Sequence, residues 1–156
     1  MAEVKQPPVT AYLTVKGGRQ AIEHYKKAFG ARLYAKKMAD DGKRVMHAAL
    51  GVYGGMVMLS DEFPEYDAQM KAPPTLRGTS VSLHVDFDRP AKVDAAMKKA
   101  KAGGCKVIFP AMDAFWGIRY GRVQDRFGHA WAFGAALPAR ATRAKPTRRK
   151  SKGSAS

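Results

Sequence analysis

Two histidines lie in segments where an imidazole could bind a metal ion or move a proton. His47 belongs to "RVMHAAL" and His84 to "SVSLHV", both of which have the alternating pattern of a strand. Two imidazoles with a third ligand nearby suit a divalent ion such as Zn, Ni, Fe or Mn. Asp86 and Glu62, at the ends of predicted strands, are the candidates for that third ligand. A metal-free general base and a neutral histidine that lines a wet pocket remain open as alternatives.

A second group combines aromatic rings with a guanidinium. Trp116 lies in the loop "DAFWGIR", while Tyr120 and Arg122 share one face of the strand that follows. The small residues Ala130 and Ala132 on the next strand leave space opposite that face. An arginine over an open aromatic surface suits an anionic or oxygen-rich ligand.

The segment "DRFGH" places an acid and a base close together in sequence, but its spacing favours a turn. Asp125 and Gly128 fit the first and last positions of a type I turn. Asp125 is then expected to accept hydrogen bonds from its own backbone. His129 has the same parity as Trp131 and Phe133, which predicts that it points away from any cleft.

The elements that would position these residues occur twice. Alternating strands are predicted at Val9–Lys16 and Thr79–Phe87, each followed by an amphipathic helix and three more strands. Asp88 is a candidate N-cap of the second helix, and Gly30 ends the first. The pattern predicts an α+β fold of two βαβββ modules. The expected boundaries are about 8–62 for module one, 63–78 for a linker and 79–137 for module two, within a single domain of residues 1–139.

The linker is long for a compact domain and carries three prolines in "DEFPEYDAQMKAPPTLRG". Connections of this length tend to be functional flaps or partner-binding segments. We therefore expect it to contribute to a binding site.

The paired modules and their last hairpin resemble a known superfamily. Paired βαβββ units that end in "D-x-F-G-H-x-W" are similar to the vicinal oxygen chelate superfamily, which includes glyoxalase I, extradiol dioxygenases and bleomycin-resistance proteins. The stretches "TAYLTVKGGRQAIEHYKKAFGA" and "FWGIRYGRVQDRFGHAW" carry the resemblance, which favours the PhnB-like branch. It implies curved mixed sheets around a cleft with the helices outside, and a homodimer.

Metal-dependent members of the superfamily hold a divalent ion with His or Glu side chains from the first and last strand of each module. The matching first-strand positions here are Thr10 and Ser82, and the last-strand glutamate position is Ala132. In module one the last strand offers Met58 or Leu59 at this place. We therefore expect no metal at the usual site, and His47 with His84 as the remaining candidates for a non-standard one.

The composition limits where the chain works. No apolar run approaches 18 residues, no hydrophobic signal core is present, and the single Cys105 fits a reducing compartment. These features predict a soluble, cytoplasmic protein without a membrane partner.

The formal net charge is +15, and subtracting the seven Lys and Arg of residues 140–156 leaves +8 for residues 1–139. That last segment is predicted to be a disordered basic tail, which could bind nucleic acid weakly.

Three functions follow as hypotheses. The favoured one is a glyoxalase/bleomycin-resistance-like protein that binds a small anionic or aromatic molecule in the cleft between the modules, without the usual metal site or another cofactor. The alternatives are a metal-dependent lyase, isomerase or dioxygenase that uses His47 and His84, and a nucleic-acid-associated protein that uses the tail; whether the chain is an enzyme stays open. The expected ligand-binding residues are Tyr12, Thr14, His47, Ser82, His84, Trp116, Tyr120 and Arg122.

Overall fold

The computed structural model describes residues 5–139 of the chain. Eight strands and three helices follow one another in the order β1, α1, β2, β3, β4, α2, β5, α3, β6, β7, β8. Their bounds are β1 Ala11–Val15, α1 Gly18–Phe29, β2 Arg32–Met38, β3 Val45–Val52, β4 Gly55–Asp61, α2 Pro73–Leu76, β5 Ser82–Phe87, α3 Pro90–Ala102, β6 Lys106–Asp113, β7 Ile118–Gln124 and β8 Ala130–Ala136.

The strands form two sheets with the same plan. The orders are β1-β4-β3-β2 and β5-β8-β7-β6, and in each sheet the first strand runs parallel to the last while the other neighbours are antiparallel. Each sheet takes one helix, α1 or α3, between its first and second strand. The predicted α+β fold of two βαβββ modules is therefore confirmed.

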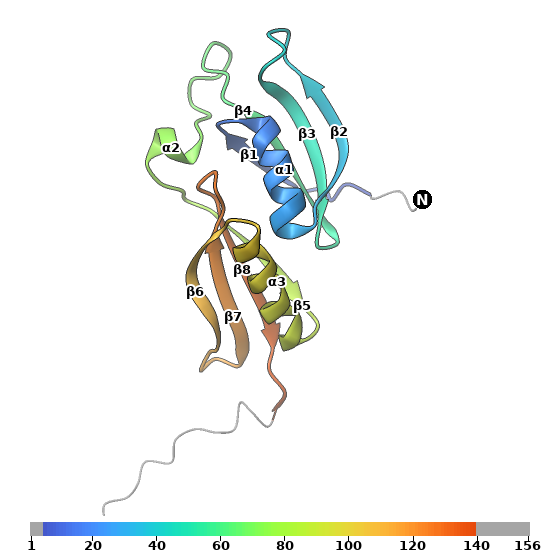
Figure 1. Ribbon diagram of the computed structural model, residues 1–156, viewed down its shortest axis with the longest axis vertical. Coiled ribbons are helices and arrows are strands. Elements are labelled where there is room, and N and C mark those ends of the chain that lie inside the picture. The colour runs from blue at the N-terminus through green and yellow to red at the C-terminus, as the bar shows by residue number, and fades with distance from the viewer. Residues whose placement is uncertain (1–4, 140–156) are drawn as a thin grey trace, which may run out of the picture.

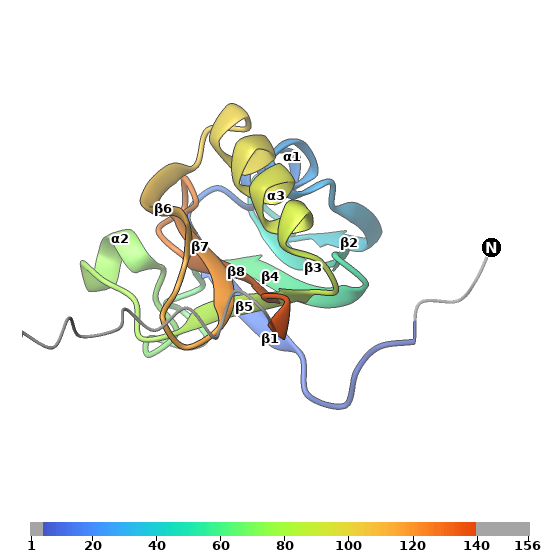
Figure 2. The ribbon, with the colours of Figure 1, turned by 90° about the horizontal axis from the view of Figure 1, so that it is seen from below.

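Both helices cover the same side of the molecule. Figure 1 shows α1 and α3 in front of the two sheets, and Figure 2 shows them next to each other above the sheets, with α2 to one side. Gly103, just after α3, lies so close to α1 that a Cβ there would be 2.5 Å from the Cα of Ala28. Neither α1 nor α3 covers the opposite face of the two sheets, which we call the helix-free side.

The core lies between the helices and the sheets. Alternation puts Val15, Leu50 and Leu59 under α1, where all three are buried. Trp131 of β8 belongs to module two but packs on α1, with its ring centroid 4.3 Å from that of Phe29. One shared core therefore joins the two modules.

Local signals account for most element ends. Gly30 ends α1 in the left-handed conformation with φ 65°, as its position after the apolar stripe predicted. The expectation for Asp88 was wrong: Arg89 takes the N-cap position of α3, and the Asp88 carboxylate pairs with Lys92 at 2.6 Å. Since Pro90 opens the helix, the N-cap is fixed one residue later than the acidic side chain suggested.

Candidate functional site

On the helix-free side of module one, two predicted site residues meet. The Tyr12 hydroxyl lies 2.9 Å from Nδ1 of His47, and their ring centroids are 5.7 Å apart. Burial raises the pKa of Tyr12, and a hydrogen bond with Ser60 works against that rise. A neutral phenol beside an imidazole can donate or accept a hydrogen bond, so this pair can orient a polar group of a ligand.

The linker folds back over this face and is fixed near its start by Arg44. The guanidinium bonds Asp41 at 2.7 Å and Glu65 at 2.6 Å, and it lies 4.3 Å from the centre of the Phe63 ring. The hydrogen bond from Arg44 is the main cause that lowers the pKa of Glu65; a backbone hydrogen bond and the positive charge of Arg44 lower it further, while burial and the nearby Asp41 carboxylate raise it. The predicted functional segment is thus an ordered cover of module one.

Glu62 fixes the far end of the linker. Its Oε1 accepts hydrogen bonds from the Ala72 amide at 2.7 Å and from the Thr75 hydroxyl. Burial raises the pKa of Glu62, but these two hydrogen bonds and nearby lysines lower it overall. Glu62 was a candidate third metal ligand, but its carboxylate holds the end of the linker in place through these two hydrogen bonds.

Two pockets lie under the linker and share a wall made of Tyr12, Thr14 and Met70. One, of about 310 Å³, opens towards Ser60, Phe63 and Tyr66; its full lining is Tyr12, Thr14, Met46, Ser60, Asp61, Phe63, Tyr66, Asp67 and Met70. The other, of about 300 Å³, lies between β1 and the start of β5; its lining includes Tyr12, Thr14, Met70, Pro73, Leu76, Ser80, Val81, Leu83 and His129. Each has the size and mixed character of a small-molecule site.

His129 differs from its prediction. Its Nε2 donates to the Thr14 carbonyl at 2.9 Å, and the ring lines the pocket between β1 and β5. The residue precedes β8, so strand parity does not decide its direction. The expectation that it points away from the cleft was wrong, and the side chain instead ties module two to module one.

Module two presents the other predicted residues on its helix-free side. In the strand register His84 and Arg122 both lie opposite Ala132, and Tyr120 lies opposite Gly134. The Trp116 ring centroid is 6.4 Å from that of Tyr120. Ser82 begins β5 in the same parity as His84 and is exposed. The structure thus gathers these residues on one face, but on a different module from Tyr12 and His47.

His84 also lines a smaller pocket of about 220 Å³ with Asp86 and Tyr53. Gly134 makes room for the His84 ring, since a Cβ there would lie 2.9 Å from Cε1. Among the pockets described, none is lined by both His47 and His84.

The donor set for a divalent ion does not fit at the usual position. The Thr10 hydroxyl donates to the Pro7 carbonyl at 2.8 Å, Ala132 has no donor, and Leu59 is fully buried in the core. Within residues 5–139, no three His, Cys, Asp or Glu side chains are grouped so that they could hold a metal ion.

Comparison with known proteins decides the family. Residues 7–133 match the family model of the Glyoxalase/Bleomycin resistance protein/Dioxygenase superfamily. The chain belongs to this superfamily. An uncharacterised protein of Mycobacterium bovis is 37% identical over 135 residues, which cover 86% of each chain. The superfamily predicted from the paired modules and the last hairpin is confirmed.

Solved structures of the superfamily agree with the fold. TioX from Micromonospora sp. ML1 is 26% identical, with TM-score 0.62 over 85% of this chain and 98% of its own. Protein PA1353 from Pseudomonas aeruginosa is 27% identical, with TM-score 0.64 over 85% of this chain and 100% of its own.

Two more distant structures show the same fold and no more. A PhnB protein from Bacillus cereus is 19% identical, with TM-score 0.61 over 83% of this chain and 100% of its own. FosX from Listeria monocytogenes, solved with Mn(II) and sulfate, is 12% identical, with TM-score 0.61 over 85% of this chain and 94% of its own. One protein with a similar fold was therefore solved with a divalent metal ion.

The acid of "DRFGH" has a structural role. Asp125 is buried and accepts hydrogen bonds from the Phe127 and His129 amides, from the Tyr25 hydroxyl at 2.7 Å and from the Trp131 indole at 2.9 Å. The predicted turn is confirmed, with the Gly128 amide donating to the Asp125 carbonyl. The two bonds from Tyr25 and Trp131, which the sequence did not reveal, join α1 to β8.

Other expectations concern Cys105 and the chain ends. Cys105 is a buried free thiol, and burial raises its pKa to about 12, which disfavours the thiolate form that a nucleophile needs. Among the described residues, no helix is long and apolar enough to cross a membrane. The basic tail of residues 140–156 lies outside the described residues.

Proposed function

We propose that this protein binds a small aromatic or anionic molecule in the paired pockets under the linker, without a metal ion. The observation that carries the proposal is the shared wall of Tyr12, Thr14 and Met70 between two cavities of about 300 and 310 Å³. A flat ring would lie against Tyr12 and Met70, because aromatic and thioether groups pack well on π surfaces. The Tyr12–His47 pair would orient a polar substituent.

Arg122 supports the anionic part of the proposal. It projects from β7 beside Tyr120 and His84 on the helix-free side, and no ion pair of Arg122 is formed within residues 5–139. A guanidinium with aromatic neighbours favours a carboxylate or phosphate. Arg122, Tyr120 and His84 lie on module two, away from the pockets of module one. They would contact a ligand in those pockets only if another protein surface covered the helix-free side of both modules.

We propose that a second copy of the chain supplies this closure, as in a homodimer. Module two exposes Phe109, Met112 and Trp116 to 48%, 50% and 58% near Arg122. Apolar groups gathered in this way mark interaction surfaces. Sedimentation velocity at micromolar concentration is expected to give the mass of a dimer, and a monomer at all concentrations would contradict this part.

An NMR titration tests the ligand site. Benzoate and related aromatic acids are added to the labelled full chain, with benzyl alcohol as the uncharged match. We expect shifts at Tyr12, Thr14 and Met70, weakened by Tyr12→Ala, and no change in affinity when EDTA is present. Shifts confined to Trp116, Tyr120 and Arg122 would move the site to module two, and a requirement for Mn or Zn would overturn metal-free binding.

A further inference from the structure

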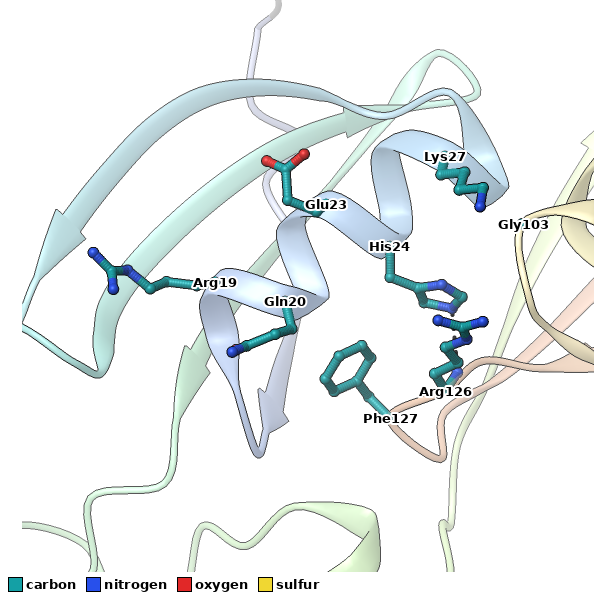
Figure 3. A pocket seen from close by; sticks show the side chains of 8 residues that line it. All are labelled: Arg19, Gln20, Glu23, His24, Lys27, Gly103, Arg126 and Phe127. Atoms are coloured by element: carbon teal, nitrogen blue, oxygen red, sulfur yellow. Dashed lines mark hydrogen bonds between the residues drawn. The ribbon is translucent and has the colours of Figure 1, made fainter.

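The helix side of the molecule carries a separate pocket of about 480 Å³ that the proposed function does not use. It lies where α1 meets the end of α3 and the β7–β8 turn, so both modules contribute to it (Figure 3). Its lining comprises Arg19, Gln20, Glu23, His24, Lys27, Gly103, Arg126 and Phe127. This position is opposite to the helix-free side, where the predicted site residues lie.

One ring nitrogen of the buried His24 lacks a hydrogen-bond partner within residues 5–139. His24 is only 7% exposed, and its Nε2 accepts a hydrogen bond from the Arg126 backbone amide at 3.2 Å. Because Nε2 is an acceptor, the proton of the neutral ring sits on Nδ1. Nδ1 is buried and has no hydrogen-bond partner within the described residues. A buried N–H without an acceptor is unfavourable, so this atom favours a bound acceptor.

The Gly103 carbonyl does not satisfy this donor. The Gly103 backbone raises the pKa of His24, but Nδ1 forms no hydrogen bond of good geometry within residues 5–139. Burial is the main influence and lowers the pKa of His24 overall. The ring therefore stays neutral around pH 7 and offers one N–H.

Two cations lie beside that donor. Figure 3 shows the Arg126 guanidinium next to the His24 ring and Lys27 directed towards the Gly103 turn. Neither cation forms an ion pair within residues 5–139. Gly104 gives Arg126 its place, because a Cβ there would lie 2.4 Å from Nε.

Glu23 is the acidic residue in the lining of the pocket; the buried Asp125 carboxylate acts on His24 through its charge but does not line the pocket. The Glu23 carboxylate points away from His24 in Figure 3 and pairs with Lys26 at 3.0 Å. Phe127 adds a flat apolar wall, with its ring centroid 5.7 Å from that of His24. Arg19 also points away from the centre of the pocket, so Lys27 and Arg126 are the cations that face it.

We infer that this pocket binds a small aromatic anion, whose carboxylate or phosphate accepts from His24 Nδ1 and pairs with Lys27 and Arg126. The aromatic part lies against Phe127. Rotation of the two exposed cationic side chains admits the anion to Nδ1, which is itself shielded from water. The inference does not depend on the proposed function, because the two sites share no residue.

The test is a titration of the full chain with phenyl phosphate, benzoate and benzyl alcohol, followed by NMR. We expect the signal of the His24 Nδ1 proton to move downfield with the two anions and not with the alcohol. The anion that binds with the higher affinity shows whether the pocket prefers a phosphate or a carboxylate. Arg126→Leu and Lys27→Met are each expected to weaken binding about tenfold, since a charge-assisted hydrogen bond is lost.

Lys98→Met on α3 is the matched control, because it removes the same charge outside the pocket. It is expected to change the affinity less than twofold. An equal loss in this variant would show attraction to net charge alone and would overturn the inference. So would anion-induced shifts that leave His24 unmoved, whatever happens at Tyr12.

Discussion

The helix side and the helix-free side of this molecule differ in how deeply their aromatic side chains are buried. On the helix side, buried aromatic rings and a buried carboxylate link the modules, through Tyr25, Trp131 and Asp125. On the helix-free side, Tyr12 and Trp116 are 44% and 58% exposed. The difference indicates that stability rests on one side, while the other can vary its surface without unfolding the chain. One scaffold can then serve several binding functions.

The largest effect should come from removing the carboxylate that joins the modules. Asp125→Ala leaves the Tyr25 hydroxyl, the Trp131 indole and two amides without their acceptor, so we expect unfolding to become easier by about 3 kcal/mol or more. Urea denaturation measures this loss. Asp125→Asn keeps the shape and part of the accepting capacity, and should lose less. Equal, small losses in both variants would break the contrast between the two sides.

A smaller effect should appear as a pH dependence that comes from the helix side. The pKa of His24 is lowered in the folded chain, mainly by burial. The charge of Asp125 raises this pKa, while the charges of Arg126 and Lys27 lower it. The Cys105 thiol also faces the ring, with its Sγ 3.7 Å from Nε2. In the unfolded chain a histidine titrates near pH 6.5. Below about pH 6.5 the unfolded chain therefore binds a proton that the folded chain does not bind. The free energy of unfolding accordingly decreases as the pH is lowered.

Urea midpoints between pH 8 and pH 5 measure this slope. In His24→Gln the part of the slope due to the imidazole should vanish, even if the variant is less stable at every pH. If the slope is identical in the two proteins, His24 does not contribute to it.

The smallest effect on stability is expected on the helix-free side. Trp116→Ser removes a ring that is mostly exposed and contacts Phe115 and Tyr120, so the free energy of unfolding should change by less than about 0.5 kcal/mol. The same variant should disrupt the proposed dimer, which sedimentation detects. A large loss of stability in the monomer would show that this face is structural after all.

Local patterns were enough to predict the fold. Strand β7 follows the Trp116 loop as predicted, and Arg122 and Tyr120 share a face because side chains alternate along a strand. The contacts between modules were not predictable in this way. Tyr25 and Asp125 are 100 residues apart, and nothing in either segment alone shows that α1 covers β8. The direction of the His129 side chain was predicted wrongly for the same reason, because its hydrogen-bond partner is the Thr14 carbonyl of β1, far away in the sequence.

The candidate site was predicted only in part. Tyr12, Thr14 and His47 were identified from strand parity, but Met70 in the linker was not, because irregular segments have no period to read. The length of the linker was the only signal, and it indicated a functional segment without saying which face it covers. His24 gave no signal, since a histidine on the inner stripe of a helix resembles a core residue.

The contact between Trp131 and Phe29 also has a consequence for synthesis on the ribosome. The apolar stripe of α1 is made early, while the β8 rings that cover it come about 100 residues later. During that interval Tyr25 and Phe29 lack their contacts with Trp131, so this part of the core is incomplete and the nascent chain is open to association with other chains. Folding of the complete core must therefore wait for the last strand, which makes the C-terminal hairpin the step that closes the whole molecule.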